Sequence, residues 1–262
     1  MISVEFMGAP GSGKSTILAH LAKEMHRRRP GRFITTDDGF LIVARERVDK
    51  IYRVILRLLP YHLALRVSAK LLNRTLLQFE AQNRFLAQHG QALCAFLTSS
   101  ASATLTDDDR AIVLANFVED GAMHTIMHDD LLQEAAIFFE EGLVQKSIMF
   151  VSQRGGDVEC SQKLEDYLSS IPLPDLVIYV KTANDICSNR MTLRPRGVPQ
   201  RLREIGNDSV LIFLERAQKH FDYVAASLQK NTAITLIEID STRQLNEVVF
   251  GLAEMMAEFF DS

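Results

Sequence analysis

The N-terminal part of the chain contains the stretch Gly8-Ala9-Pro10-Gly11-Ser12-Gly13-Lys14-Ser15, which fits the pattern GxxxxGK[ST] at every fixed position. An apolar run at 2–7 precedes it, and apolar residues recur after it at helical spacing from Ile17 to Met25. A glycine-rich turn between a strand and a helix presents backbone N–H groups to phosphate oxygens at the helix N-terminus. We therefore predict a phosphate-binding loop. The alternative, a glycine-rich turn that binds nothing, leaves Lys14 and Ser15 unexplained.

The residue types in this loop predict a nucleoside triphosphate with Mg²⁺. Lys14 is expected to reach the β and γ phosphates, and the Ser15 hydroxyl is expected to ligate Mg²⁺. Thr16 is the expected contact of the α phosphate. The sequence has no Asn-Lys-x-Asp guanine signature, so ATP is favoured over GTP. The residues expected to bind ATP are Gly8, Ala9, Pro10, Gly11, Ser12, Gly13, Lys14, Ser15 and Thr16.

Strand and helix patterns alternate along the chain. Five short β-rich runs lie at 2–7, 33–36, 124–128, 175–181 and 233–239. Amphipathic helical patterns lie between and after them, which predicts an α/β fold with a parallel five-stranded sheet covered on both faces. Residues 39–123 contain no convincing strand and are expected to form a large helical insertion at one edge of the sheet. A smaller helical insertion is expected at 130–171.

The length and amino-acid composition are those of an ordinary folded protein. The chain has 262 residues, of which 47% are hydrophobic and 24% charged, and this composition excludes collagen-like and wholly disordered classes. We expect one domain, 1–262. The net charge of −4 argues against a nucleic-acid partner. The first seven residues run directly into the glycine loop and leave no room for a leader peptide, so a cytoplasmic protein is expected.

Two pairs of acids follow predicted strands. Asp129 and Asp130 end the run 124–128, where a carboxylate would assist Ser15 at Mg²⁺, and we predict Asp129 as that metal ligand. Asp37 and Asp38 end the second strand, where a carboxylate can face an acceptor hydroxyl, and Asp38 is predicted as general base. Paired acids after a strand also serve as helix caps, which is the alternative for both pairs.

Between residues 190 and 203 the chain carries five arginines and no acid. Arginine forks suit phosphate oxygens, and a loop of this kind can close over a transferring phosphoryl group and exclude water. We predict an Arg-rich lid at 190–206, and a solvated basic loop is the alternative. The arginines expected to act in catalysis are Arg190, Arg194 and Arg196.

The segment 45–74 is strongly basic, with eight basic residues and two acids. Apolar side chains lie on one face of its first helical stretch, from Ile51 to Leu59, and Lys50, Arg53 and Arg57 lie on another. This basic amphipathic pattern is compatible with docking on anionic lipid headgroups. Two other interpretations stay open: a core-facing helix with a solvated side, and a lining of basic side chains for a phosphorylated or otherwise anionic acceptor.

These residues resemble the nucleoside and nucleotide kinases of the P-loop class, and thymidylate kinase-like proteins in particular. The resemblance covers 2–38, then 174–180 with the helix and arginines that follow, and finally 237–241. It implies the sheet order 2-3-1-4-5. The Asp-Arg-Tyr type motif expected after the third strand is absent, Asp37-Asp38-Gly39 replaces the acidic-proline turn after the second, and the insertion 39–123 is longer than thymidylate kinase suggests. The acceptor is therefore not transferable from the family.

The resulting prediction is a Mg²⁺-dependent kinase that transfers the γ-phosphoryl group of ATP to a small acceptor, such as a nucleoside or nucleotide. The alternative is a regulatory or membrane-associated ATPase that acts on a macromolecular partner and transfers phosphate only to water.

Overall fold

The five strands form one parallel sheet in the order β2-β3-β1-β4-β5. The computed structural model describes residues 1–73, 76–131, 135–151, 162–194 and 207–261. In the register of the sheet, Val4 of β1 lies opposite Phe138 of β3 and Leu176 of β4. The predicted fold class and strand order are therefore confirmed. The strands are β1 (Ile2–Met7), β2 (Phe33–Thr35), β3 (Ala136–Phe139), β4 (Leu176–Lys181) and β5 (Thr235–Asp240).

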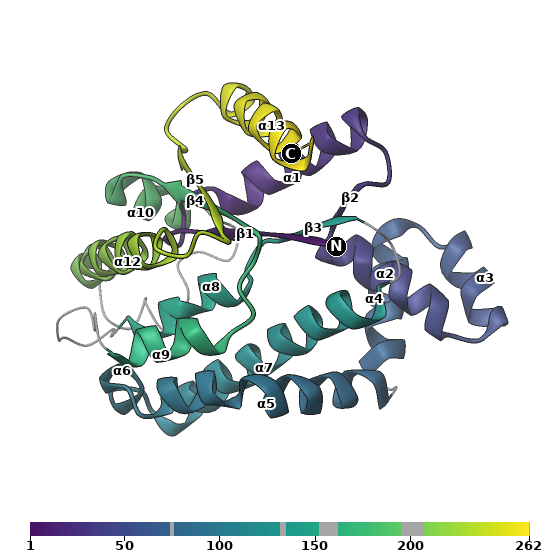
Figure 1. The fold of residues 1–262 in the computed structure, drawn as a ribbon, viewed down its shortest axis with the longest axis horizontal. Helices are drawn as coiled ribbons and strands as arrows, with labels where there is room; N and C mark the ends of the chain where they lie inside the picture. Colours follow the sequence, from purple (N-terminus) through teal and green to yellow (C-terminus); the bar gives the residue numbers. More distant parts are fainter. Residues whose placement is uncertain (74–75, 132–134, 152–161, 195–206, 262) are drawn as a thin grey trace.

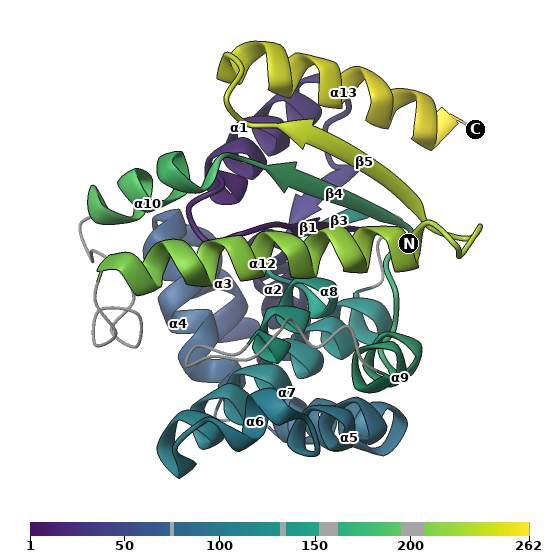
Figure 2. The same ribbon diagram turned by 90° about the vertical axis from the view of Figure 1, so that its left-hand side faces the viewer.

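Helices cover both faces of the sheet and make the fold three-layered, with α1 and α13 on one face and the other helical layer opposite (Figures 1 and 2). The helices are α1 (Lys14–Arg28), α2 (Thr36–Arg47), α3 (Lys50–Leu58), α4 (Tyr61–Asn73), α5 (Leu76–Leu97), α6 (Ser100–Ala103), α7 (Asp107–Asp130), α8 (Leu143–Lys146), the 3₁₀ turn η1 (Ser147–Phe150), α9 (Gln162–Ser170), α10 (Asn184–Thr192), α12 (Asn207–Leu228) and α13 (Leu245–Asp261).

Alternating side chains of each strand enter two separate cores. Phe6 of β1 and Ile178 of β4 are buried against Leu21 of α1 and Leu252 of α13. Their neighbours along the strands point the other way, and Tyr179 is buried in a core shared with α5, α9 and α12. A strand buried on both faces needs apolar residues at nearly every position. The apolar composition of β1 and β4 therefore reflects burial on both sides.

The third strand is not where the sequence pattern put it. Residues 124–128 lie inside α7, a helix that begins at the N-cap Thr106, whose side chain accepts a hydrogen bond from Asp109 N. The buried residues Phe117 and Gly121, and likewise Ala122 and Ile126, are four residues apart, which is the spacing of neighbours on one face of a helix. The prediction of a strand at 124–128 is therefore wrong. The true third strand, β3, lies within the segment 130–171 that was expected to form a helical insertion.

The segment 39–123 contributes α2 to α6 and most of α7. Within it, α3 ends before Pro60 and α5 ends at Leu97, before the polar run 98–102. The helices α5 and α7 lie along each other beneath α9 (Figure 1). None of the helices in the described ranges is long and apolar enough to cross a membrane.

Candidate active site

The loop between β1 and α1 adopts a conformation that two of its glycines make possible. Gly11 has φ +86°, and a Cβ atom there would lie 2.4 Å from the carbonyl oxygen of Cys187. Gly13 is the N-cap of α1 and has φ 97°, in the left-handed region of backbone conformation that residues other than glycine rarely adopt. The chain can therefore turn sharply into α1 and direct the first backbone N–H groups of that helix toward a ligand. This is the geometry that an anion-binding helix N-terminus requires.

Lys14 is buried beside this loop. Its Nζ atom donates hydrogen bonds to the carbonyl oxygens of Gly8, at 2.7 Å, and Ala9, at 3.2 Å. Burial lowers the pKa of Lys14 to about 8, against the attraction of Glu141 and Glu140 for its charge. The ammonium is thus held at the loop by two neutral acceptors, where a negatively charged phosphate would be a stronger partner.

A carboxylate lies beside the loop serine. The Ser15 hydroxyl donates a short hydrogen bond to Glu140 Oε1, and Glu140 directly follows the last residue of β3. A hydroxyl and a carboxylate oxygen are ligands that Mg²⁺ takes, with phosphate oxygens and water completing the coordination. The residues present therefore fit a Mg²⁺–triphosphate group. Among the described residues no cluster of three His, Cys, Asp or Glu side chains could hold a metal by itself.

Asp129 has different neighbours. It lies in the last turn of α7, where Oδ2 pairs with Arg84 Nη1 at 3.0 Å and Oδ1 contacts His128 Nδ1 at 3.0 Å. The metal-ligand role predicted for Asp129 rested on a strand that the structure replaces with a helix. Sequence reasoning missed Glu140 for the same reason. The signal that identifies Glu140 is a short, continuously apolar strand, 136–139, followed at once by acids.

Residues after β4 and β5 support the loop from the other side. Thr182 Oγ1 donates to the carbonyl oxygen of Ser12 at 3.0 Å. Arg190 donates to the same carbonyl at 3.2 Å and to the Ser241 hydroxyl at 2.9 Å. The guanidinium of Arg190 is therefore occupied in positioning the loop. Arg194 lies beside the loop cavity described below, whereas Arg196 and the rest of the predicted 190–206 lid, from residue 195 on, lie outside the described residues.

A buried chain of hydrogen bonds connects β1 with the start of the loop. Glu5 Oε1 accepts from Gln145 N at 2.6 Å, and Gln145 Oε1 accepts from Gly8 N at 2.8 Å. Burial raises the pKa of Glu5 to about 7. Gly142 leaves room for this carboxylate, because a Cβ atom there would lie 2.4 Å from Glu5 Cδ. The sequence alone does not distinguish Glu5, since an acid within an apolar strand has no distinctive spacing.

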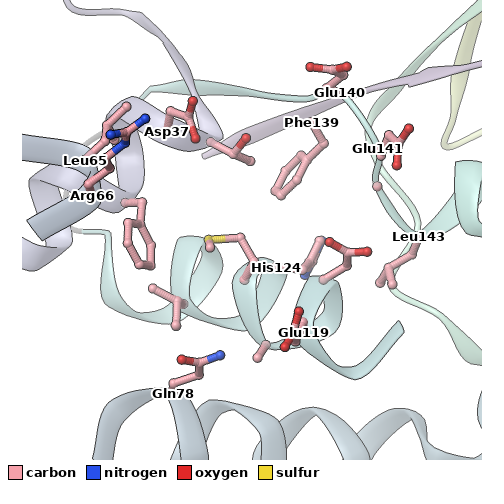
Figure 3. Close-up of a pocket in the computed structure, with 17 residues that line it drawn as sticks. Asp37, Leu65, Arg66, Gln78, Glu119, His124, Phe139, Glu140, Glu141 and Leu143 are labelled. Carbon is pink, nitrogen blue, oxygen red and sulfur yellow. The ribbon is translucent and has the colours of Figure 1, made fainter. Parts of the chain in front are cut away.

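Two cavities meet at Glu140 and Glu141. The smaller has a volume of about 300 Å³ and is lined by Lys14, Ser15 and Arg194 as well as by apolar side chains of the helical layer. The larger has a volume of about 730 Å³ and lies between α2, α4, α5, α7 and the turn after β3 (Figure 3). The loop residues thus line one cavity, and a second cavity of ligand size adjoins it.

The larger cavity is acidic. Among the described residues that line it, Arg66 of α4 carries the positive charge. His124 also lines the cavity but is neutral at pH 7, because burial lowers its pKa to about 4. Of the acids, Asp120 and Glu141 pair with Lys146 Nζ, at 2.6 and 3.4 Å, which leaves Asp37, Glu119 and Glu140 outside these ion pairs. A ligand in this cavity would therefore face a negative potential. The carboxylates that line it are those of Asp37, Glu119, Asp120, Glu140 and Glu141.

The adjacent acids Asp37 and Asp38 separate at the start of α2. Asp38 belongs to a capping box with Thr35, whose hydroxyl donates to Asp38 Oδ2 at 2.7 Å, and Tyr61 donates to Asp38 Oδ1 at 2.8 Å. Asp37 instead lines the larger cavity (Figure 3). Its pKa is raised, first by burial and then by the charge of Asp38. The geometry therefore gives Asp38 the capping role and turns Asp37 toward the cavity.

Comparison with known proteins does not establish a function, so the function has to be inferred from the geometry of the site. No protein-family model matches the chain, and no curated protein matches it either. Among solved structures, deoxyadenosine kinase from M. mycoides with the products dCMP and a flexible dCDP is similar, with 12% sequence identity and a TM-score of 0.43 over 98% of this chain and 100% of that chain. The same kinase with bound dCTP has 11% identity and a TM-score of 0.45 over the same shares. Similarity at this level carries no argument about the reaction.

Proposed function

We propose that the protein is a Mg²⁺-dependent kinase that transfers the γ-phosphoryl group of ATP to a hydroxyl group of a small acceptor. The observation that supports this most is the contact between Ser15 of the phosphate loop and Glu140 at the end of β3, beside a buried Lys14. Bound Mg²⁺–ATP would supply the transferable phosphoryl group. The loop amides, Lys14, Ser15 and Glu140 would hold it, and Arg194 would balance negative charge in the same cavity.

The larger cavity is our proposed acceptor site. It adjoins the loop cavity through Glu140 and Glu141, so an acceptor bound there would lie next to the transferred group. Asp37 is the carboxylate that we propose as general base in place of Asp38, because the Asp38 carboxylate is engaged by Thr35 and Tyr61. A raised pKa suits Asp37 for accepting a proton from a hydroxyl group.

The charge of this cavity restricts the acceptor. Five carboxylates and one arginine line it, so a second phosphate group would be repelled. The interpretation that the basic segment 45–74 surrounds an anionic acceptor is also disfavoured, because Arg66 is the one described basic side chain of that segment in the lining. We therefore propose an uncharged or positively charged hydroxyl compound of nucleoside size, and we disfavour nucleoside monophosphates.

A panel of acceptors tests this function. ADP release would be measured with nucleosides, aminosugars, neutral sugars and nucleoside monophosphates at equal concentration, with Lys14→Ala as the inactive control. We expect at least tenfold stimulation by one uncharged or cationic compound, with the phosphorylated product detected by mass spectrometry. ATP turnover that no small acceptor stimulates, with phosphate released only to water, would instead favour the regulatory ATPase. Full activity of Lys14→Ala would refute both functions.

A further inference from the structure

The apolar face of α3 points to solvent. Ile51, Val54, Ile55 and Leu58 follow the i, i+3, i+4, i+7 spacing of one helix face, and their exposed fractions run from 41% for Ile55 to 79% for Leu58. In a globular protein a face with this spacing is normally packed against the core. In α3 the one buried residue is Leu56, on a different face. The interpretation of this helix as core-facing is therefore wrong.

Lys50 and Arg57 are exposed basic side chains beside the apolar face of α3, whereas Arg53 is half-buried on the far side of the helix. Lys50, Arg53 and Arg57 belong to α3, and no ion pair recorded between described residues involves any of them. Arg53 donates a hydrogen bond to the carbonyl oxygen of Glu46 at 3.2 Å, so the positive charge beside the exposed face comes from Lys50 and Arg57. The helix thus combines exposed apolar side chains with positive charge.

The position of α3 leaves this face open to a large surface. The helix lies at the outer end of the molecule, packed against α2 and α4 and away from the sheet (Figure 1). Its neighbour α4 exposes the large side chains of Tyr61 and Leu63, which adds apolar surface at the same end. Exposed apolar patches of this kind mark interaction sites.

Charge decides which partner fits. A second copy of the chain would bring the same positive side chains against one another, which is unfavourable. A membrane with anionic headgroups offers negative charge to Lys50 and Arg57 and an acyl boundary to Ile51, Val54 and Leu58. We propose that α3 docks the protein peripherally on anionic lipid bilayers, lying in the plane of the interface. Binding through one nine-residue helix would be weak and reversible.

Vesicle sedimentation tests the proposal without nucleotide or acceptor. The full chain would be mixed with vesicles of phosphatidylcholine alone or with one third phosphatidylglycerol. We expect binding only to the anionic vesicles, with loss of binding in 0.5 M NaCl. The double variant Lys50→Gln/Arg57→Gln should lower the partition coefficient about 25-fold, since each basic residue near an anionic surface contributes roughly a factor of five. The variant Ile51→Glu/Leu58→Glu should abolish binding.

Matched controls separate this surface from general stickiness. Ile112 of α7 is also an exposed apolar residue, so Ile112→Glu should bind like the wild type, and all variants should keep the wild-type melting temperature because the changed side chains are exposed. Equal binding to neutral and anionic vesicles, or unchanged binding by Ile51→Glu/Leu58→Glu, would overturn the proposal. Absence of vesicle binding together with a dimer that the same variant dissociates would identify a second copy as the partner instead.

Discussion

Asp37 and Asp38 are neighbours in the chain, but their surroundings give them different roles. Asp38 is held by Thr35 and Tyr61 at the start of α2, and Asp37 faces the acidic cavity. The sequence identifies the pair but cannot separate its members, because the capping box and the cavity wall depend on where α2 begins and on which elements pack beside it.

Isosteric variants of the two acids should therefore have opposite consequences. Asp37→Asn should lower acceptor phosphorylation at least about 100-fold, the usual contribution of a general base, without lowering the melting temperature. Asp38→Asn should retain most activity but lower stability by about 1 kcal/mol through the weakened cap, which is roughly 2–4 °C for a chain of this size. Each variant is the control for the other in parallel kinetics and calorimetry. Loss of activity in Asp38→Asn with activity retained in Asp37→Asn would instead identify Asp38 as the general base.

Lys14 makes ATP affinity depend on pH. Its pKa in the free protein is about 8, and a bound triphosphate would favour the charged ammonium. The Kd for ATP should therefore stay nearly constant between pH 7.2 and 8 and rise toward about tenfold per pH unit above pH 8. Lys14→Arg should bind more weakly but without this dependence, because arginine stays charged. Calorimetric titration from pH 7.2 to 9.5 would measure both, and a constant wild-type Kd up to pH 9.5 would contradict this assignment.

The strand β1 and the turn before α8 form a unit that sets the start of the loop. Glu5 and Gln145 link them to Gly8 through two buried hydrogen bonds. The cost of this arrangement is an acid without access to water, whose pKa lies near 7 in the fold and near 4.5 in the unfolded chain. Protonation of Glu5 therefore favours the folded state.

The stability of the protein should change with pH accordingly. The contribution of protonated Glu5 is fully present below pH 4.5 and is lost as the pH rises to 7. Glu5→Gln imitates the protonated acid, so its contribution should not vary in this window, and at pH 8 the variant should be more stable than the wild type by up to about 3 kcal/mol. Urea unfolding at pH 5 and pH 8 would measure the difference. Equal stability of the two proteins at pH 8 would show that the carboxylate is paired by charge.

Some elements could be predicted from the sequence and others could not. The pattern GxxxxGK[ST] and its flanks defined β1, the loop and α1, and apolar runs located β2, β4 and β5 to within two residues at each end. The prediction of the third strand failed for two reasons. The strand β3 has only four residues, and the β-branched and apolar residues of 124–128 also suit the buried side of a long helix. Because β3 was misplaced, Glu140 and Glu141 could not be assigned to the cavity, since their position depends on where that strand ends.

Across the whole molecule, charge is unevenly distributed. The net charge of −4 is the balance of a segment, 45–74, with an excess of six positive charges and a remainder with an excess of ten negative charges. The structure places five carboxylates in the lining of the larger cavity, and the basic helix α3 lies at the outer end of the molecule (Figure 1). An acceptor and a membrane would thus be recognised by opposite charges at separate places. This separation was not readable from the sequence, because it depends on which helices line the cavity.

The most direct test of the active-site assignment compares carboxylate variants in Mg²⁺–ATP turnover. ADP release would be measured at saturating Mg²⁺–ATP with the best acceptor of the panel, for the wild type, Glu140→Gln and Asp129→Asn. We predict that Glu140→Gln falls by at least about 100-fold, because it removes the carboxylate beside the Ser15 hydroxyl at the predicted metal position. Asp129→Asn should stay within about threefold of the wild type, as expected for an acid that is paired with Arg84 and does not contact Ser15. An active Glu140→Gln together with an inactive Asp129→Asn would contradict the site described for this protein.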